Sequence, residues 1–161
     1  MSETDLATLK RLSAPAVSPD GTMVAYQLRE TDMVANKGVT DLYMLTLGNP
    51  AAKPVKFASK ASKNENDPAF SPDGKSIYYL SNESGSKQLW RYDIKTGKAA
   101  QASDFKADVS GFKISPDGKR FAIWGDIGRE CGGFGCEQDG DTSKPGPGTG
   151  REYNRLMVRH W

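Results

Sequence analysis

The side chains best suited to chemistry in this sequence are one histidine, two cysteines, and the serines and aspartates of a recurring tetrapeptide. His160 is the single histidine and falls in a segment, residues 155–161, that the sequence predicts to be a strand. A serine hydrolase needs a nucleophile, a histidine and an orienting acid, and the sequence contains no Gly-x-Ser-x-Gly elbow. We therefore expect His160 to face solvent or a packing interface, and we assign no catalytic residue.

The two cysteines, Cys131 and Cys136, lie close together in a loop rich in Gly and Pro that we expect at about residues 127–150. Cysteines at this spacing could form a disulfide, which would point to an oxidising compartment, and free thiols are the alternative. Zinc is disfavoured because it would need two further Cys or His ligands nearby. The pairing of Cys131 with Cys136 is left open at this point.

Other parts of the same loop offer weaker signals. Glu137, Asp139 and Asp141 carry carboxylates, but they lack the regular ligand spacing of a calcium loop, so a solvated acidic segment is expected. The glycines of residues 146–150 have no preceding strand and no Gly-Lys-Ser pattern, which disfavours a phosphate cradle. We predict a flexible flap and expect neither a metal nor a cofactor.

The tetrapeptide Ser-Pro-Asp-Gly occurs three times, at residues 18–21, 71–74 and 115–118. Proline pre-sets φ for the second position of a turn, aspartate can accept hydrogen bonds from the backbone ahead, and glycine adopts the left-handed conformation that closes the loop. This chemistry predicts a hairpin with a three-residue loop and a bulge rather than a catalytic site. The predicted turn residues are Pro19, Asp20, Gly21, Pro72, Asp73, Gly74, Pro116, Asp117 and Gly118.

A β-prone run follows each turn, and a second alternating run follows in the first two units, at residues 41–47 and 88–94. Alternation predicts strands with one face buried, so the neighbours Leu89 and Trp90 should face opposite sides of their sheet. The turns begin at residues 18, 71 and 115, which are 53 and then 44 residues apart. A period of about 40 to 50 residues is typical of four-stranded propeller blades.

We therefore predict an all-β fold: a partial β-propeller of about three four-stranded blades, the third incomplete, with a short N-terminal helix. The helix is expected because Ser2 can cap it and Leu6, Leu9 and Leu12 follow at helical spacing. The expected organisation is a helix and lead-in at 1–13, a partial propeller at 14–161, and blade-like units at about 14–60, 65–104 and 107–161.

The hairpins and the strands that follow them, such as Leu89-Trp90-Arg91-Tyr92, resemble blades in the N-terminal propeller of the prolyl oligopeptidase family. The opening segment, residues 5–21, and the segment 155–161 look like those of bacterial dipeptidyl and acylaminoacyl peptidase relatives. The resemblance covers essentially the whole chain. It implies a C-terminal α/β-hydrolase domain of the same polypeptide, absent here, and peptide substrates whose access the propeller limits. No triad residue has a counterpart, and a Tol-type binding propeller without catalysis is the alternative.

Charge and hydropathy argue against two classes of partner, nucleic acids and membranes. The 22 basic and 20 acidic residues give a net charge of +2 without a basic block, so we expect no nucleic-acid binding. No segment is apolar enough to predict a membrane span. The N-terminus lacks the apolar core of a secretory signal, so we expect a periplasmic or secreted protein if a signal peptide was removed and a cytoplasmic one otherwise.

Overall fold

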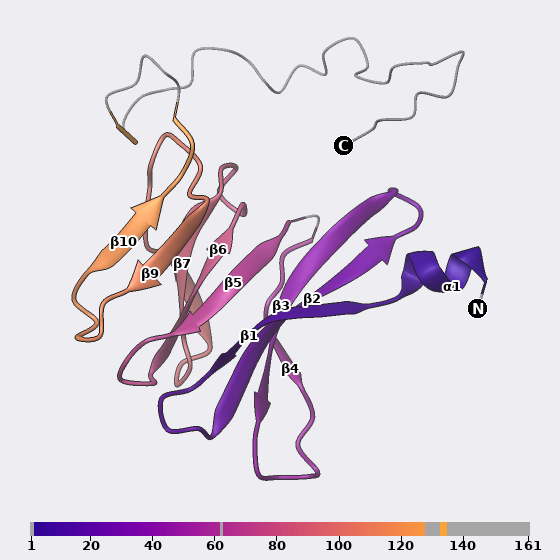
Figure 1. Ribbon diagram of the computed structural model, residues 1–161, viewed down its shortest axis with the longest axis horizontal. Coiled ribbons are helices and arrows are strands. Elements are labelled where there is room, and N and C mark those ends of the chain that lie inside the picture. The colour runs from indigo at the N-terminus through magenta and orange to yellow at the C-terminus, as the bar shows by residue number, and fades with distance from the viewer. Residues whose placement is uncertain (1, 62, 128–132, 135–161) are drawn as a thin grey trace, which may run out of the picture.

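The computed structural model of this protein describes residues 2–61, 63–127 and 133–134 (Figure 1). A short helix precedes ten strands in the described part of the chain. The elements are α1 (Glu3–Thr8), β1 (Arg11–Val17), β2 (Met23–Asp32), β3 (Lys37–Thr46), β4 (Val55–Ala58), β5 (Glu65–Phe70), β6 (Ser76–Ser81), β7 (Gln88–Asp93), β8 (Lys98–Gln101), β9 (Gly111–Ile114) and β10 (Phe121–Trp124).

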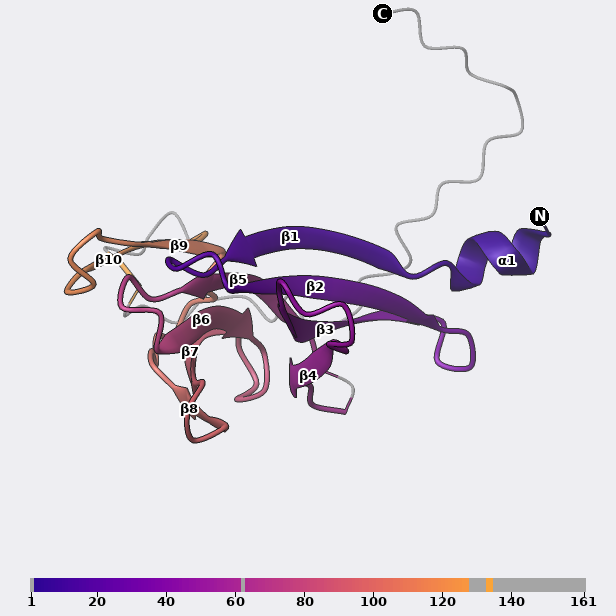
Figure 2. The ribbon, with the colours of Figure 1, turned by 90° about the horizontal axis from the view of Figure 1, so that it is seen from below.

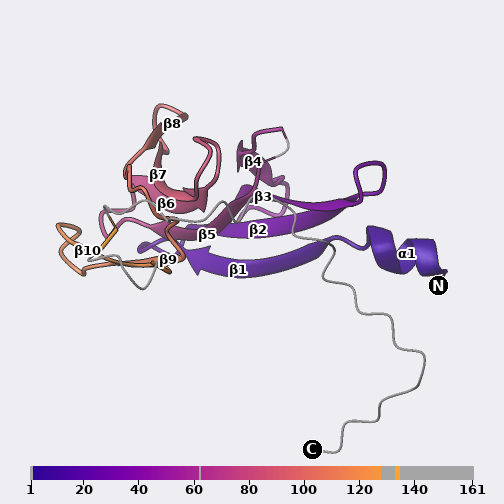
Figure 3. The same cartoon turned by 90° about the horizontal axis from the view of Figure 1, so that it is seen from above.

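The strands form two antiparallel four-stranded sheets, in the orders β1-β2-β3-β4 and β5-β6-β7-β8, and a two-stranded sheet of β9 and β10. Each four-stranded sheet is a simple meander, because sequential strands joined by short loops pair with their neighbours. The first strands β1, β5 and β9 lie on one side of the molecule and β4 and β8 on the other (Figures 2 and 3). The prediction of an all-β, partial propeller is confirmed.

Two apolar clusters hold the sheets together. The first joins the first two sheets through Ala25, Leu42 and Ala58 on one side and Ile77, Tyr79 and Tyr92 on the other. The second joins the second sheet to the third through Leu80, Leu89, Val109 and Phe112.

The neighbours Leu89 and Trp90 belong to different clusters. Leu89 is in the second, whereas Trp90 packs against the first, so the two side chains face opposite sides of β7 as predicted. Each face of the second sheet is thus covered by a different neighbouring sheet, as burial between blades requires.

The N-terminal helix is shorter than its leucine spacing suggests. Ser2 caps it by accepting the backbone N–H of Asp5, and the Asp5 side chain accepts the N–H of Ser2 in return. The helix ends at Thr8, and Leu12 lies in β1, where it pairs with Leu28 of β2. Leu12 therefore belongs to a strand and not to a helical stripe, because pairing with β2 satisfies its backbone.

Two strands of the third unit are described, β9 and β10. The strand predicted at 155–161, with His160, lies outside the described residues, as do Cys131, Cys136, Glu137, Asp139, Asp141 and the segment 146–150. Within the described residues, no helix is long and apolar enough to cross a membrane.

Candidate functional site

Each Ser-Pro-Asp-Gly turn is closed by its serine side chain. In the first copy, Ser18 Oγ accepts the backbone N–H of Met23 at 2.8 Å and donates to Asp20 Oδ1 at 2.6 Å. The same Asp20 oxygen accepts the N–H of Thr22 at 3.0 Å. The Ser18 N–H donates to Met23 O, so the loop holds four residues instead of the predicted three. The extra residue fits because Ser18 Oγ bonds to the Met23 amide and Asp20 bonds to the Thr22 amide.

The second and third copies repeat this network with nearly the same distances. Ser71 Oγ accepts from Ser76 N at 3.0 Å and donates to Asp73 at 2.6 Å, and Ser115 Oγ donates to Asp117 at 2.5 Å. The glycine that follows each aspartate has a φ near +70°: 71° at Gly21, and 69° at Gly74 and Gly118. All three serine hydroxyls are thus engaged in turn hydrogen bonds.

Hydrogen bonding also sets the protonation of the turn aspartates. The Ser18 hydroxyl and the Thr22 amide lower the pKa of Asp20 to about 2. The Ser71 and Ser115 hydroxyls, with the following amides, lower the pKa values of Asp73 and Asp117. A carboxylate held ionised by donors is a poor general acid or base near neutral pH, so these aspartates are suited to holding turns.

The structure brings the three turns together in a row. A Cβ added to Gly74 would lie 3.7 Å from Pro19 Cδ, and one added to Gly118 would lie 3.4 Å from Pro72 Cδ. The proline of one turn therefore packs beside the glycine of the next. Sequence spacing alone did not reveal this contact, because the partners lie on different sheets.

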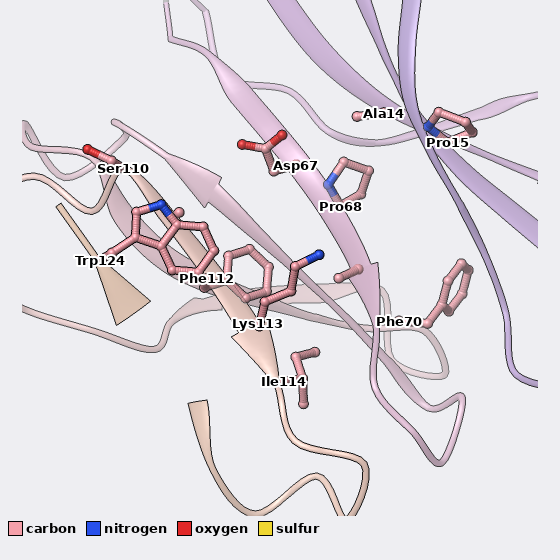
Figure 4. A pocket seen from close by; sticks show the side chains of 12 residues that line it. Ala14, Pro15, Asp67, Pro68, Phe70, Ser110, Phe112, Lys113, Ile114 and Trp124 are labelled. Atoms are coloured by element: carbon pink, nitrogen blue, oxygen red, sulfur yellow. The ribbon is translucent and has the colours of Figure 1, made fainter. Parts of the chain in front are cut away.

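A pocket of about 480 Å³ lies between the first strands of the second and third units, β5 and β9 (Figure 4). Residues 110–114 line it consecutively, together with Asp67 and Pro68 of β5, Pro15 of β1 and Trp124 of β10. We call it the inner-edge pocket. It contains one acidic side chain, Asp67, and one basic side chain, Lys113.

The backbone is unusual beside this pocket. Ala14 and Asp67 have left-handed φ values of 47° and 53°. Both precede a proline and lie in a bulge of their strand, β1 in one case and β5 in the other. The amide of Asp67 donates to Gln27 Oε1 at 3.2 Å, so the first unit holds the bulge of the second. Such conformations cost free energy for non-glycine residues and persist only where surrounding contacts hold them.

Trp124 forms one wall of the inner-edge pocket. It pairs with Gly111 across β9 and β10, and a Cβ at Gly111 would lie 2.3 Å from its indole, so the ring lies directly on the glycine. Leu80 occupies the same position in the sequence relative to Ser71 as Trp124 does relative to Ser115. Trp124 is 48% exposed, whereas Leu80 is fully buried under the third unit. Trp124 thus marks an uncovered sheet face among the described residues.

Glu65 is the titratable group that the sequence reasoning missed. Its side chain is 2% exposed; Oε1 accepts from Ser81 Oγ at 3.2 Å, and Oε2 is buried without a hydrogen-bond partner. Burial raises the pKa of Glu65 to about 7, and repulsion from Asp41 adds to this, although Ser81 opposes it. Its neighbours Asn64, Asn66 and Asp67 are polar, so no local pattern indicates that Glu65 is buried, and its burial depends on packing between sheets.

The described residues contain no cluster of three or more His, Cys, Asp or Glu that could hold a metal ion. The turn serines of the second and third units have their hydroxyls bonded to aspartate, and no histidine is among the residues that the structure describes. This part of the chain forms a pocket lined by strand edges, aromatic rings and two opposite charges.

Known proteins with similar sequences include peptidases and Tol-Pal system proteins. Dipeptidyl-peptidase 5 of Porphyromonas gingivalis is 33% identical over 154 residues, covering 96% of this chain and 21% of that protein. The Tol-Pal system protein TolB of Francisella tularensis is 38% identical over 56 residues, covering 35% of this chain and 13% of that protein. The chain therefore spans about a fifth of the length of the peptidase relative.

A solved structure shows the same arrangement of strands. Uncomplexed acylaminoacyl peptidase of Pyrococcus horikoshii superposes with a TM-score of 0.58 at 27% identity, over 81% of this chain and 19% of that chain. These likenesses fit the N-terminal propeller of a prolyl oligopeptidase-family peptidase. Residues 6–134 match the model of one protein family, which is described as PD40, the TolB beta propeller domain. With its repeated turns and its side-by-side meander sheets, this chain belongs to the TolB β-propeller family.

Proposed function

We propose that this chain is the propeller part of a serine peptidase of the dipeptidyl or acylaminoacyl type, and that the propeller limits which substrates reach a hydrolase domain elsewhere in the polypeptide. The observation that carries the proposal is the extent of the similarity. The likeness to dipeptidyl-peptidase 5 runs over 96% of the chain, whereas the likeness to TolB covers 35%.

The physical basis of selection would be steric. Blades arranged around a channel admit a short extended peptide and exclude a folded protein, so discrimination comes from access rather than from contacts with the catalytic residues. This proposal includes the unit boundaries 14–60, 65–104 and 107–161 and a flap at 127–150. Cys131 and Cys136 of the flap are either joined in a disulfide or present as free thiols.

The test uses the longer polypeptide that contains this segment. Its kcat/KM is measured on substrates of rising length, from a chromogenic dipeptide derivative to a folded protein, before and after residues 127–150 are shortened. We expect the unaltered protein to cleave only the short substrates and the shortened one to accept longer peptides. Unchanged ratios at every length would refute the access role while leaving the peptidase assignment intact.

The alternative is a Tol-type propeller that binds a protein partner without catalysis, which the 56-residue likeness to TolB favours. It predicts no cleavage of any peptide by the longer polypeptide. It also predicts a stable complex with a folded protein, measurable by light scattering.

A further inference from the structure

The three inner strands differ in how they protect their free edges. Among the described residues, the strand orders place β1, β5 and β9 each at the edge of its sheet, with one side paired and the other unpaired. An unpaired strand edge is a template for another extended chain, and natural proteins block such edges with prolines and bulges.

The first two units carry this protection at the same place. Pro15 and Pro68 each stand three residues before the serine of their turn, and each lies in a bulge that breaks the strand register. In the third unit the corresponding residue is Phe112, and the pairing of β9 with β10 runs without a break from Gly111 to Ile114. The third unit therefore lacks the proline, whereas its strand register still shifts before Gly111, where the Ser110 N–H donates to Trp124 O at 2.9 Å.

The direction of the β9 amides follows from its pairing. The Ser115 N–H donates to Arg120 O at 2.9 Å, and Ile114 then pairs with Phe121. Hydrogen-bonded pairs alternate along antiparallel strands, so the N–H and C=O groups of Phe112 and Ile114 point away from β10. This is the side on which residues 110–114 line the inner-edge pocket.

We propose that the free edge of β9 binds an extended peptide segment as an added antiparallel or parallel strand in the inner-edge pocket. The backbone groups of Phe112 and Ile114 supply the hydrogen bonds, and Asp67 and Lys113 flank the peptide with opposite charges. Main-chain pairing of this kind accepts many sequences, which suits a protein that handles peptides. The inference that the bound peptide is a substrate rests on the function proposed above, whereas the inference that a peptide binds does not.

The first experiment uses this 161-residue chain and an acetylated, amidated hexapeptide of alternating Thr and Ser, whose blocked ends exclude recognition of terminal charges. Amide chemical shifts are followed by NMR during titration. We expect shifts at Phe112 and Ile114 and not at the amides of β1 or β5. Shifts confined to those other strands, or no shifts, would overturn the proposal.

Modified peptides test the hydrogen bonds without changing the protein. N-methylation of every second residue leaves one edge of the peptide able to donate, and N-methylation of every residue leaves none. We expect the half-methylated peptide to bind within about threefold of the parent and the fully methylated one to bind at least about tenfold more weakly. Equal binding by all three peptides contradicts the proposal.

Protein variants supply the matched pair. Phe112→Pro imitates Pro15 and Pro68 and removes the donor, whereas Phe112→Leu keeps the amide and an apolar side chain. Only the proline variant should lose peptide binding, read from the Ile114 amide. If Phe112→Pro does not fold, the methylated peptides still decide the question. Because no hydrolase domain is needed, absence of binding here and absence of cleavage by the longer polypeptide are separate results.

Discussion

Glu65 shows how the fold changes the chemistry of a single residue. Its carboxyl group is buried with one oxygen unpartnered, and its pKa is raised from 4.5 to about 7. The folded state therefore binds the proton more tightly than the unfolded state. The contribution of Glu65 to stability is full below pH 4.5 and is lost as the pH rises toward 7, where the buried group must ionise.

Replacing Glu65 with Gln removes this penalty. The difference in free energy of unfolding between Glu65→Gln and the unaltered chain should grow in favour of the variant by about 2 kcal/mol from pH 5 to pH 8. Urea unfolding at both pH values measures this difference. Glu30→Gln, which removes an exposed carboxylate paired with Lys10, is the control for the loss of a surface charge. A difference that does not vary with pH would show that Glu65 is not protonated in the folded state.

The turn glycines allow a second comparison at single residues. Gly74→Ala should cost about 1 to 2 kcal/mol, because its φ of 69° is unfavourable for a residue with a Cβ. Gly21→Ala should cost nearly the same, although no atom lies within 4 Å of its added Cβ, because the 3.7 Å contact at Gly74 is ordinary packing.

Gly74→Asn separates the two causes. Asparagine tolerates the left-handed conformation better than alanine, so this variant should recover part of the loss despite its larger side chain. Thermal unfolding of the three variants measures the comparison. If Gly74→Asn were the least stable, the contact with Pro19 would outweigh backbone conformation.

Among the elements, the hairpin turn is the repeated device, and its serine closes it. Ser71→Ala removes two hydrogen bonds and leaves the buried Ser76 amide without its acceptor, so we expect a loss of about 1 to 3 kcal/mol. Ser115→Ala is the matched control, since its Arg120 amide is exposed and can bond to water. Urea unfolding of both variants gives the difference. Equal losses would mean that burial of the turn does not matter.

For the whole molecule, the cost of a cavity depends on whether a neighbouring sheet covers the residue. Leu80 is fully buried between the second and third sheets, so Leu80→Ala should cost about 2 to 5 kcal/mol. Trp124 stands at the corresponding place on the third sheet and is 48% exposed, so in this chain Trp124→Ala should cost less than about 1 kcal/mol. The free energies of unfolding of both variants test this. A large loss at Trp124 would show that its face is covered.

Much of the fold follows from local sequence patterns. The Ser-Pro-Asp-Gly turns, the alternation along residues 88–94 and the spacing of the units predict meander sheets, because turn chemistry and strand periodicity act over a few residues. The position of Leu12 was mistaken for the same reason: its spacing from Leu6 and Leu9 fits a helix, but pairing with Leu28 is a contact between strands.

Contacts between sheets could be read only from the tertiary structure. Pro72 lies beside Gly118, Glu65 loses its water, and the Phe112 amide faces a pocket that Pro15 and Pro68 also line. Each of these depends on how units tens of residues apart in sequence pack against one another. A local pattern specifies backbone conformation and which face of a strand is apolar, whereas burial, pKa shifts and free edges depend on what the neighbouring sheet covers.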